Sequence, residues 1–247
     1  MTEADREIFY EAVSAHPDGR STSTAARLAR TACEQGYGGV VLRADPERET
    51  AGGPASPAEI ADDYGIDVVE GIEIRTDAPG SASGALGEYR AEYTLVILAG
   101  GTEAMNRFAA EEPRVDVLAR PMAGRGDVDH VIAKAAARNG VRIEFDLASA
   151  LRTGGGRRVR ALSGLRKLRE LVEKYDVPYV VSAGAGSHLE LRAPRELAAV
   201  GEAIGFPREA VLEGLREWGR LTARNRDLQG GSFIEPGVRE GRYGEQS

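Results

Sequence analysis

The chain has almost no cysteine and no long apolar run. Its 247 residues include a single cysteine, Cys33, so no disulfide can form within the chain, and a lone thiol fits a reducing compartment. No apolar stretch reaches the ~18–20 residues that span a bilayer, and the acidic start "MTEADREIFY" is unlike a signal peptide. We therefore expect a cytoplasmic chain without membrane contact. Cys33 lies mid-helix without a nucleophile motif around it, and we expect it in the core.

Lysine is also scarce. Of the 32 basic residues only Lys134, Lys167 and Lys174 are lysines, and the net charge is -7 with a pI of about 5.2. This balance argues against nucleic-acid binding through bulk charge. An acidic, lysine-poor surface favours a cytoplasm with molar salt, where the Debye length is roughly 3 Å; a GC-rich genome is the alternative explanation. Phosphate recognition in such salt must be short-range, a task that suits the planar guanidinium group.

Short β-rich runs alternate with helical patterns along the chain. Seven runs have strand character: Ile8–Val13, Gly39–Leu42, Val68–Ile74, Tyr93–Leu98, Val115–Ala119, Val141–Leu147 and Pro178–Ser182. Helical spacing covers Ser21–Gln35, Asp127–Asn139, Arg157–Tyr175, Pro194–Ile204 and Arg208–Asp227. The alternation predicts a single α/β domain over residues 1–227, folded as a distorted TIM-like (β/α) barrel. An open doubly wound sheet is the alternative.

Several segments between these elements are expected to be flexible. The stretches "RADPERETAGGPASP" and "DAPGSASGALGEYR" are rich in Gly, Pro and Ser. The stretch "GGGRR" before Arg160 predicts a mobile basic loop. Residues 228–247 form a C-terminal tail that we expect to be partly flexible.

The ends of the predicted strands carry most of the candidate site residues. Active sites of (β/α) barrels lie at the carboxyl ends of the strands. The first strand ends in Ser14-Ala15-His16, and the third, "GIEIR", supplies Glu73 and Arg75. The remaining strand ends supply Arg43, Arg120, His188, Arg192 and Arg195.

This arrangement resembles the polymerase-and-histidinol-phosphatase (PHP) fold, a distorted barrel that binds metals on H-x-H, G-x-E, H-P and D-x-H motifs. Here Ser14 stands in place of the first His, with His16 as the second, and Glu73 matches the G-x-E carboxylate. Arg120 replaces the H-P histidine, and Gly184 lies near the expected D-x-H aspartate. The resemblance implies a degenerate site in which His16, Glu73 and His188 are remnants and no metal is bound. For His16 the alternative is a capping or core histidine, and for Glu73 it is an ion pair with a neighbouring arginine.

Within that fold the chain more closely resembles the archaeal ribonuclease P protein component 3 family, the counterpart of the eukaryotic thirty-kilodalton subunit. The stretches that carry the resemblance are "AHPDG", "GIEIR", "PRVDVLARPM", "GGRRVRALSGLRKLRELVEKY", "LRAPRELAAVGEAIGF" and "FIEPGVREGRY". The resemblance implies a non-catalytic subunit of a ribonucleoprotein that matures tRNA 5′ ends. It further implies ribonuclease P RNA, component 2 and, indirectly, precursor tRNA as partners. The chain would bind no cofactor, and Mg²⁺ would serve the RNA.

Three predicted strand ends carry arginine: Arg43, Arg75 and Arg120. Guanidinium groups at a barrel mouth suit phosphate oxygens and repel metal ions. Such contacts position an RNA backbone without identifying its bases. We therefore predict that these three residues bind RNA. The alternative is that they pair with Glu73, Asp45 or Asp77.

The helix Arg157–Tyr175 predicts a second RNA contact. Ala161, Leu165, Leu168 and Val172 follow helical spacing and predict a buried stripe. Arg160, Lys167 and Lys174 recur every seven residues on another face, which we predict to contact phosphates or a partner subunit. The alternative is a solvated face supported by a Glu170–Lys174 pair.

The stretch "LRAPREL" predicts a third contact. Pro194 fits the first position of a helix, and Arg192 and Arg195 flank it near amide groups that attract anions. An ordinary strand-to-helix turn is the alternative. In the last helix, Arg216, Arg220 and Arg224 recur every four residues, and Glu213 and Glu217 can neutralise them.

Two functions of other classes stay open. One is a metal-dependent phosphoesterase of the PHP type that retains a reduced site around His16, Glu73 and His188. The other is a protein scaffold, whose RNA affinity would not change when Arg43, Arg75 and Arg120 are replaced by alanine.

Overall fold

The computed structural model describes residues 8–15, 23–47, 56–230, 233–235 and 238–239. Its centre is a parallel sheet in which the strands pair in sequence order. The strands are β1 (Tyr10–Val13), β2 (Gly39–Ala44), β3 (Asp67–Ile74), β4 (Leu95–Ala99), β5 (Val117–Ala119), β6 (Arg142–Asp146) and β7 (Tyr179–Ser182). All seven predicted strands are therefore confirmed.

The sheet curves until its two edges meet. The link is a parallel bridge between Val13 and Ala185, in which the Ser14 N–H donates to the Ala185 carbonyl at 2.9 Å. Because β1 and β7 are joined at this one place, the barrel is nearly closed. The predicted TIM-like (β/α) barrel is thus confirmed, and the open doubly wound sheet is excluded.

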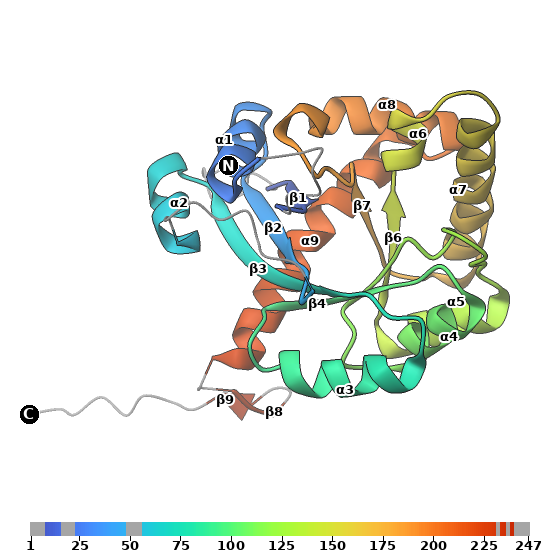
Figure 1. Cartoon of the computed structure of the whole chain (residues 1–247), viewed down its shortest axis with the longest axis horizontal. Helices are drawn as coiled ribbons and strands as arrows, with labels where there is room; N and C mark the ends of the chain where they lie inside the picture. Colours follow the sequence, from blue (N-terminus) through green and yellow to red (C-terminus); the bar gives the residue numbers. More distant parts are fainter. Residues whose placement is uncertain (1–7, 16–22, 48–55, 231–232, 236–237, 240–247) are drawn as a thin grey trace, which may run out of the picture.

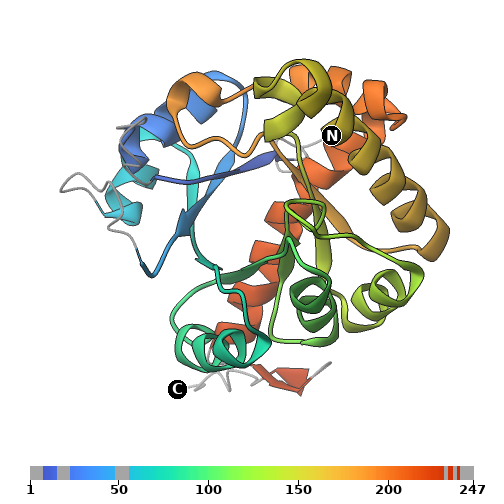
Figure 2. The ribbon, with the colours of Figure 1, turned by 45° about the vertical axis from the view of Figure 1, so that its right-hand side comes forward.

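Helices connect the strands and cover the outside of the barrel (Figures 1 and 2). They are α1 (Ala25–Glu34), α2 (Pro57–Tyr64), α3 (Pro79–Tyr89), α4 (Glu103–Glu111), α5 (His130–Asn139), α6 (Ala148–Arg152), α7 (Gly155–Tyr175), α8 (Pro194–Ile204) and α9 (Arg208–Gln229). A 3₁₀ turn spans His188–Glu190, and a hairpin of β8 (Phe233–Glu235) and β9 (Val238–Arg239) follows α9. No helix within the described ranges is long and apolar enough to cross a membrane.

The helix boundaries follow from local chemistry. The Asp129 side chain accepts from the amides of Val131 and Ile132 and so caps the start of α5. The same helix ends at Gly140, whose positive φ of 67° is a conformation that glycine adopts at little cost. The predicted end of this helix at Asn139 is therefore confirmed.

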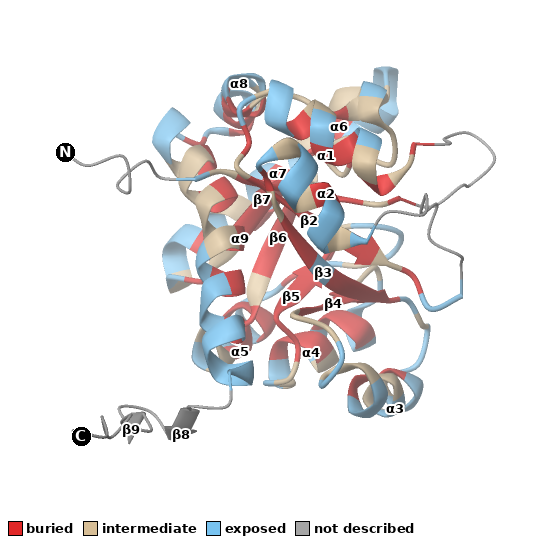
Figure 3. Ribbon diagram, turned by 90° about the vertical axis from the view of Figure 1, so that its left-hand side faces the viewer, coloured by how far each residue is buried: buried red, intermediate tan, exposed pale blue. Residues whose placement is uncertain are grey.

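The last helix, α9, closes the barrel where β1 and β7 diverge. It packs against both strands, and Trp218, fully buried, donates its Nε1–H to the Val181 carbonyl at 2.9 Å. Trp218 and Leu221 join the inward-facing strand side chains in one apolar cluster. Figure 3 shows most residues of the barrel strands as buried, while the helices carry exposed residues on their outer faces.

Two segments predicted to be flexible are helical. Within "DAPGSASGALGEYR", helix α3 buries Ala82 and Leu86, and it contacts β3 and β4. One buried pair at helical spacing thus outweighs the low helix propensity of Gly and Ser. The "GGGRR" stretch is also partly helical, because α7 begins at Gly155.

Two further predictions, on Cys33 and on the domain boundary, differ from the structure. Cys33 is exposed, so its predicted place in the core is wrong: α1 buries Ala25, Leu28, Ala29 and Ala32 instead. The predicted boundary at residue 227 falls inside α9, which continues to Gln229. Most of the predicted flexible tail lies outside the described residues, as do residues 48–55 of "RADPERETAGGPASP".

Candidate functional site

The carboxyl ends of β2, β3, β5 and β6 bring four charged side chains into one network. Arg43 on β2 pairs with Glu144 on β6, and its Nη1 lies 3.5 Å from Glu73 Oε2 on β3. Arg120, which follows β5, pairs with the same Glu73. Each guanidinium therefore lies between strands that are far apart in sequence and ties them together across the mouth of the barrel.

Arg43 is the centre of this network. It is only 3% exposed, and its guanidinium carbon lies 5.5 Å from the centre of the Trp218 ring. Burial alone lowers its pKa, but Glu144 and Glu73 outweigh burial and raise it above the usual value. Arg43 is thus a permanently charged, buried cross-link, with no surface to offer a phosphate. The structure does not support its predicted contact with RNA.

Glu73 accepts from arginines on two sides. Arg75 Nε donates to Glu73 Oε1 at 3.0 Å, and Arg120 contacts the same carboxylate. Burial by itself raises the pKa of Glu73, but Arg120, Arg43 and Arg75 together lower it to about 2. The alternative in which Glu73 pairs with neighbouring arginines is therefore correct. Arg75 and Arg120 keep 40% and 29% of their side chains exposed, and their RNA contact stays a prediction.

Two carboxylates on β6 belong to the mouth and were missed in the sequence. Glu144 accepts from Ser182 Oγ at 2.6 Å, and Asp146 accepts from the Ala148 amide at 2.7 Å. Burial and the nearby Glu144 raise the pKa of Asp146. The signal was present in "RIEFD", where two acids separated by one residue share one face of a strand and Ile143 and Phe145 occupy the other face.

Asp146 also fills the space beside Gly184. A Cβ at Gly184 would lie 2.5 Å from Asp146 Oδ1, and the residue has a positive φ of 60°. The position where the PHP resemblance expects an aspartate is therefore occupied by a carboxylate from another strand.

These donors do not fit a metal ion. His188 lies in the 3₁₀ turn, where its Nδ1 is 2.8 Å from Ser23 Oγ, and His16 lies outside the described residues. Glu73 and Glu144 already pair with guanidinium groups, which repel cations. Within the described ranges, no group of three or more His, Cys, Asp or Glu side chains could hold a metal.

Helix α7 buries Leu165, Leu168 and Val172 as predicted. On the predicted binding face, Lys167 pairs with Asp127 at 2.5 Å, and Lys174 Nζ lies 5.4 Å from the centre of the Tyr175 ring. Arg160 is exposed. All three residues remain accessible, and their contact with RNA stays a prediction.

The start of α8 is capped by its own carboxylate. Glu196 accepts from the Ala193 amide at 2.9 Å, so part of the predicted anion site is already occupied. Arg192 donates to the carbonyls of Leu189 and Leu191, whereas Arg195 is exposed. An RNA contact by Arg192 and Arg195 stays a prediction.

Two arginines of α9 are neutralised by carboxylates of the same helix. Arg216 pairs with Glu209 and Glu213, and Arg220 pairs with Glu213 and Glu217. The carboxylates suggested by the sequence therefore do face these arginines.

We expect Glu73 to contribute to stability mainly above pH 4.5. Its pKa is about 2 in the folded chain against 4.5 ordinarily, so its contribution is lost as pH falls through that interval. At roughly 1.4 kcal/mol per pKa unit, the interval corresponds to roughly 3 kcal/mol. The deficit of Glu73→Gln relative to wild type, measured by urea unfolding at stepped pH in molar salt, should shrink from pH 4.5 to 2. A constant deficit would contradict the network.

The chain is similar to proteins of known identity. Ribonuclease P protein component 3 of Halorubrum lacusprofundi is 55% identical over 241 residues, which cover 96% of this chain and 99% of that protein. Its counterpart in Haloarcula marismortui is also 55% identical, covering 94% of this chain and 96% of that protein.

Among solved structures, a chain of an archaeal ribonuclease P with mature tRNA, determined by cryo-EM, superposes with a TM-score of 0.78. The superposition covers 96% of this chain and 100% of that chain at 23% identity, so it supports the fold alone. The family model described as RNase P subunit p30 matches residues 8–229. The chain therefore belongs to the RNase P subunit p30 family.

Proposed function

We propose that this chain is a non-catalytic, RNA-binding protein subunit of ribonuclease P that supports removal of tRNA 5′ leaders by the catalytic RNA. One observation carries the non-catalytic part of the proposal. At the strand ends, where a hydrolytic barrel needs free carboxylates and histidines, Glu73 and Glu144 are paired with guanidinium groups. Carboxylates held in such ion pairs are not free to ligate a metal or to act as a general base.

The role left for the chain is to position RNA. Exposed guanidinium groups bind phosphate oxygens through planar pairs of donors, which hold a backbone without selecting sequence. In molar salt the long-range attraction is screened, so the contacts that remain are those that act at hydrogen-bond distance. Arg75, Arg120, Arg160 and Arg195 are accessible for this role.

The proposed partners are ribonuclease P RNA and the other protein subunits, chiefly component 2, with precursor tRNA bound indirectly. The proposal includes no cofactor on this chain and assigns Mg²⁺ to the RNA. The arginines at the barrel mouth support the assignment of Mg²⁺ to the RNA, because their guanidinium groups repel a divalent cation.

Reconstitution of the particle with and without this chain tests the proposal. We expect omission to slow 5′-leader cleavage or to raise the Mg²⁺ concentration that cleavage requires, because the RNA loses contacts that hold its fold. Cleavage is measured in single turnover across a Mg²⁺ series. Unchanged cleavage and an unchanged Mg²⁺ requirement would contradict the proposal.

A metal-dependent phosphoesterase is the competing function. Metal analysis of the purified chain separates the two functions. Stoichiometric Zn or Mn, together with phosphatase activity that His16→Ala abolishes, would favour the phosphoesterase.

A further inference from the structure

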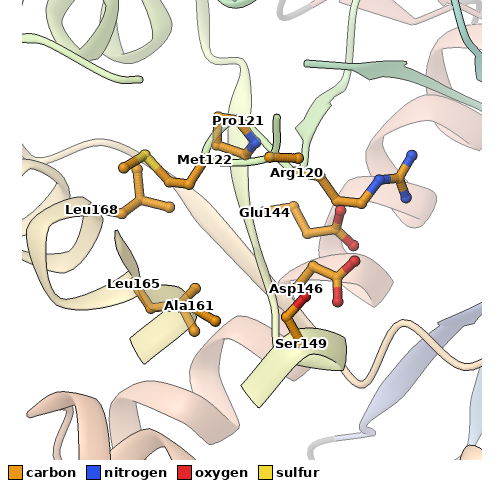
Figure 4. Close-up of a pocket in the computed structure, with 10 residues that line it drawn as sticks. Arg120, Pro121, Met122, Glu144, Asp146, Ser149, Ala161, Leu165 and Leu168 are labelled. Carbon is orange, nitrogen blue, oxygen red and sulfur yellow. The ribbon is translucent and has the colours of Figure 1, made fainter. Parts of the chain in front are cut away.

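An open cavity of about 110 Å³ lies between the loop after β5 and the middle of α7. Figure 4 shows its two unlike sides. One side is apolar and consists of Met122, Ala161, Leu165 and Leu168. The other side is polar and consists of Arg120, Glu144, Asp146 and Ser149.

The size of the cavity limits its occupant. An apolar cavity of about 150 Å³ accepts one benzene ring. The present cavity, at about 110 Å³ and open to solvent, therefore holds most of a single six-membered ring but not a fused pair. Its polar side offers a hydroxyl and carboxylates to the edge of such a ring.

The segment that forms the apolar side is strongly basic. From Arg152 to Arg169 the chain has seven cations and no Asp or Glu, although the whole chain carries a net charge of -7. Arg157, Arg158 and Arg160 in the first turns of α7 are exposed, as is Arg125 in the loop. Within the described part of the chain, none of these four has a carboxylate in ion-pair distance.

These cations adjoin the cavity. A Cβ at Gly164 would lie 3.6 Å from Met122 Cβ, so this face of α7 is turned toward the loop. Arg157 and Arg160 precede Gly164 by seven and four residues, which places them on the same face of the helix. Further along this face the pattern changes, because Lys167 is neutralised by Asp127. Lys174, still further along, contacts the Tyr175 ring. Cations without an ion pair are therefore most concentrated at the start of α7 beside the cavity.

We propose that this cavity receives an unstacked pyrimidine base of RNA and that Arg125, Arg157 and Arg160 hold the phosphates on either side of it. The inference rests on the proposed function and adds a specific site to it. The ring packs against Met122 and Leu165, which supply the apolar contact that unstacked bases need.

The edge of the base would meet polar groups at the far wall. Ser149 can donate or accept through its hydroxyl, and Asp146 can accept from an amino or imino group. Charge favours RNA over a protein side chain as the occupant, because exposed arginines without an ion pair lie on the loop and the helix that line the cavity, and phosphates accompany every base.

Short-wave ultraviolet light, which crosslinks unmodified pyrimidines to nearby side chains, tests this site in the reconstituted particle. We expect a pyrimidine of ribonuclease P RNA to crosslink to the peptide with Met122 or to the peptide with Ala161. Ala161→Phe fills the cavity and should lower this yield by about five- to hundredfold, the range expected from the loss of one base contact. The control Ser163→Phe places the same ring on an exposed position of the same helix and should leave the yield unchanged.

A second pair of variants keeps the test independent of how well Ala161→Phe folds. Arg157→Ala with Arg160→Ala should lower the same crosslink, whereas Arg107→Ala, which removes an ion pair with Glu103 on α4, should not. Two results would overturn this inference and leave the proposed function standing. In one, the chain enters the particle but no crosslink forms at the cavity. In the other, the cavity crosslinks to a protein subunit. A chain that does not enter the particle overturns both.

Discussion

Replacing Arg43 by alanine is expected to lower the free energy of unfolding by about 3–5 kcal/mol, the range for breaking a buried ion pair. The change leaves Glu144 and Glu73 buried without their central cation, and it removes the contact with the Trp218 ring. Urea unfolding in molar salt measures the loss.

Two further variants separate charge from packing. Arg43→Met with Glu144→Leu replaces the pair by apolar groups and should recover part of the loss, because Glu144 is no longer a buried carboxylate without its cation and Glu73 keeps Arg75 and Arg120. Arg107→Ala breaks an exposed pair on α4 and should change stability by less than about 1 kcal/mol. If Arg43→Ala also loses less than about 1 kcal/mol, the network does not hold the mouth together.

The isolated chain is expected to unfold when salt is withdrawn. Lowering the salt from molar to ~0.1 M lengthens the Debye length from about 3 Å to about 10 Å. Carboxylates on the surface of a chain with net charge -7 then repel one another. The haloarchaeal origin of the relatives at 55% identity is consistent with this expectation.

Circular dichroism during dialysis measures this unfolding. The helical signal should fall at low salt and return when molar salt is restored. Replacing Asp62 and Asp63 on α2 by asparagine should move the transition to lower salt, because one local concentration of negative charge is removed. A signal that is unchanged down to ~0.1 M would contradict the expectation.

The architecture was predictable because parallel strands that are buried on both faces appear as short apolar runs. All seven runs became strands, and the buried stripe of Leu165, Leu168 and Val172 followed from helical spacing. Helix α3 was missed because its apolar content is low and its stability comes from packing against β3 and β4. Tertiary contacts of this kind leave little trace in local sequence.

The ion-pair partners of the arginines at the mouth were harder to predict. Arg43 and Glu144 are 101 residues apart, and only closure of the barrel brings them together. The sequence placed three arginines at strand ends and offered Glu73 as an alternative partner, but it did not identify Glu144 as a partner. Strand alternation could have revealed Glu144 and Asp146, because their spacing puts both on one face of β6.

This pairing changes which surface is available to RNA. The deepest of the three predicted mouth arginines, Arg43, supports the barrel, whereas accessible, unneutralised cations gather at the start of α7. A barrel whose mouth is internally neutralised can still contribute to a ribonucleoprotein through its outer helices, because phosphate contacts require exposed donors rather than a deep site.

Cleavage of precursor tRNA with the RNA component left out tests most directly whether this chain is non-catalytic. All protein subunits are present in this assay, with or without this chain. We expect no release of the 5′ leader in either case, and release when the RNA is added back. Leader release that requires this chain but not the RNA, and that Glu73→Gln abolishes, would contradict the non-catalytic role of this chain.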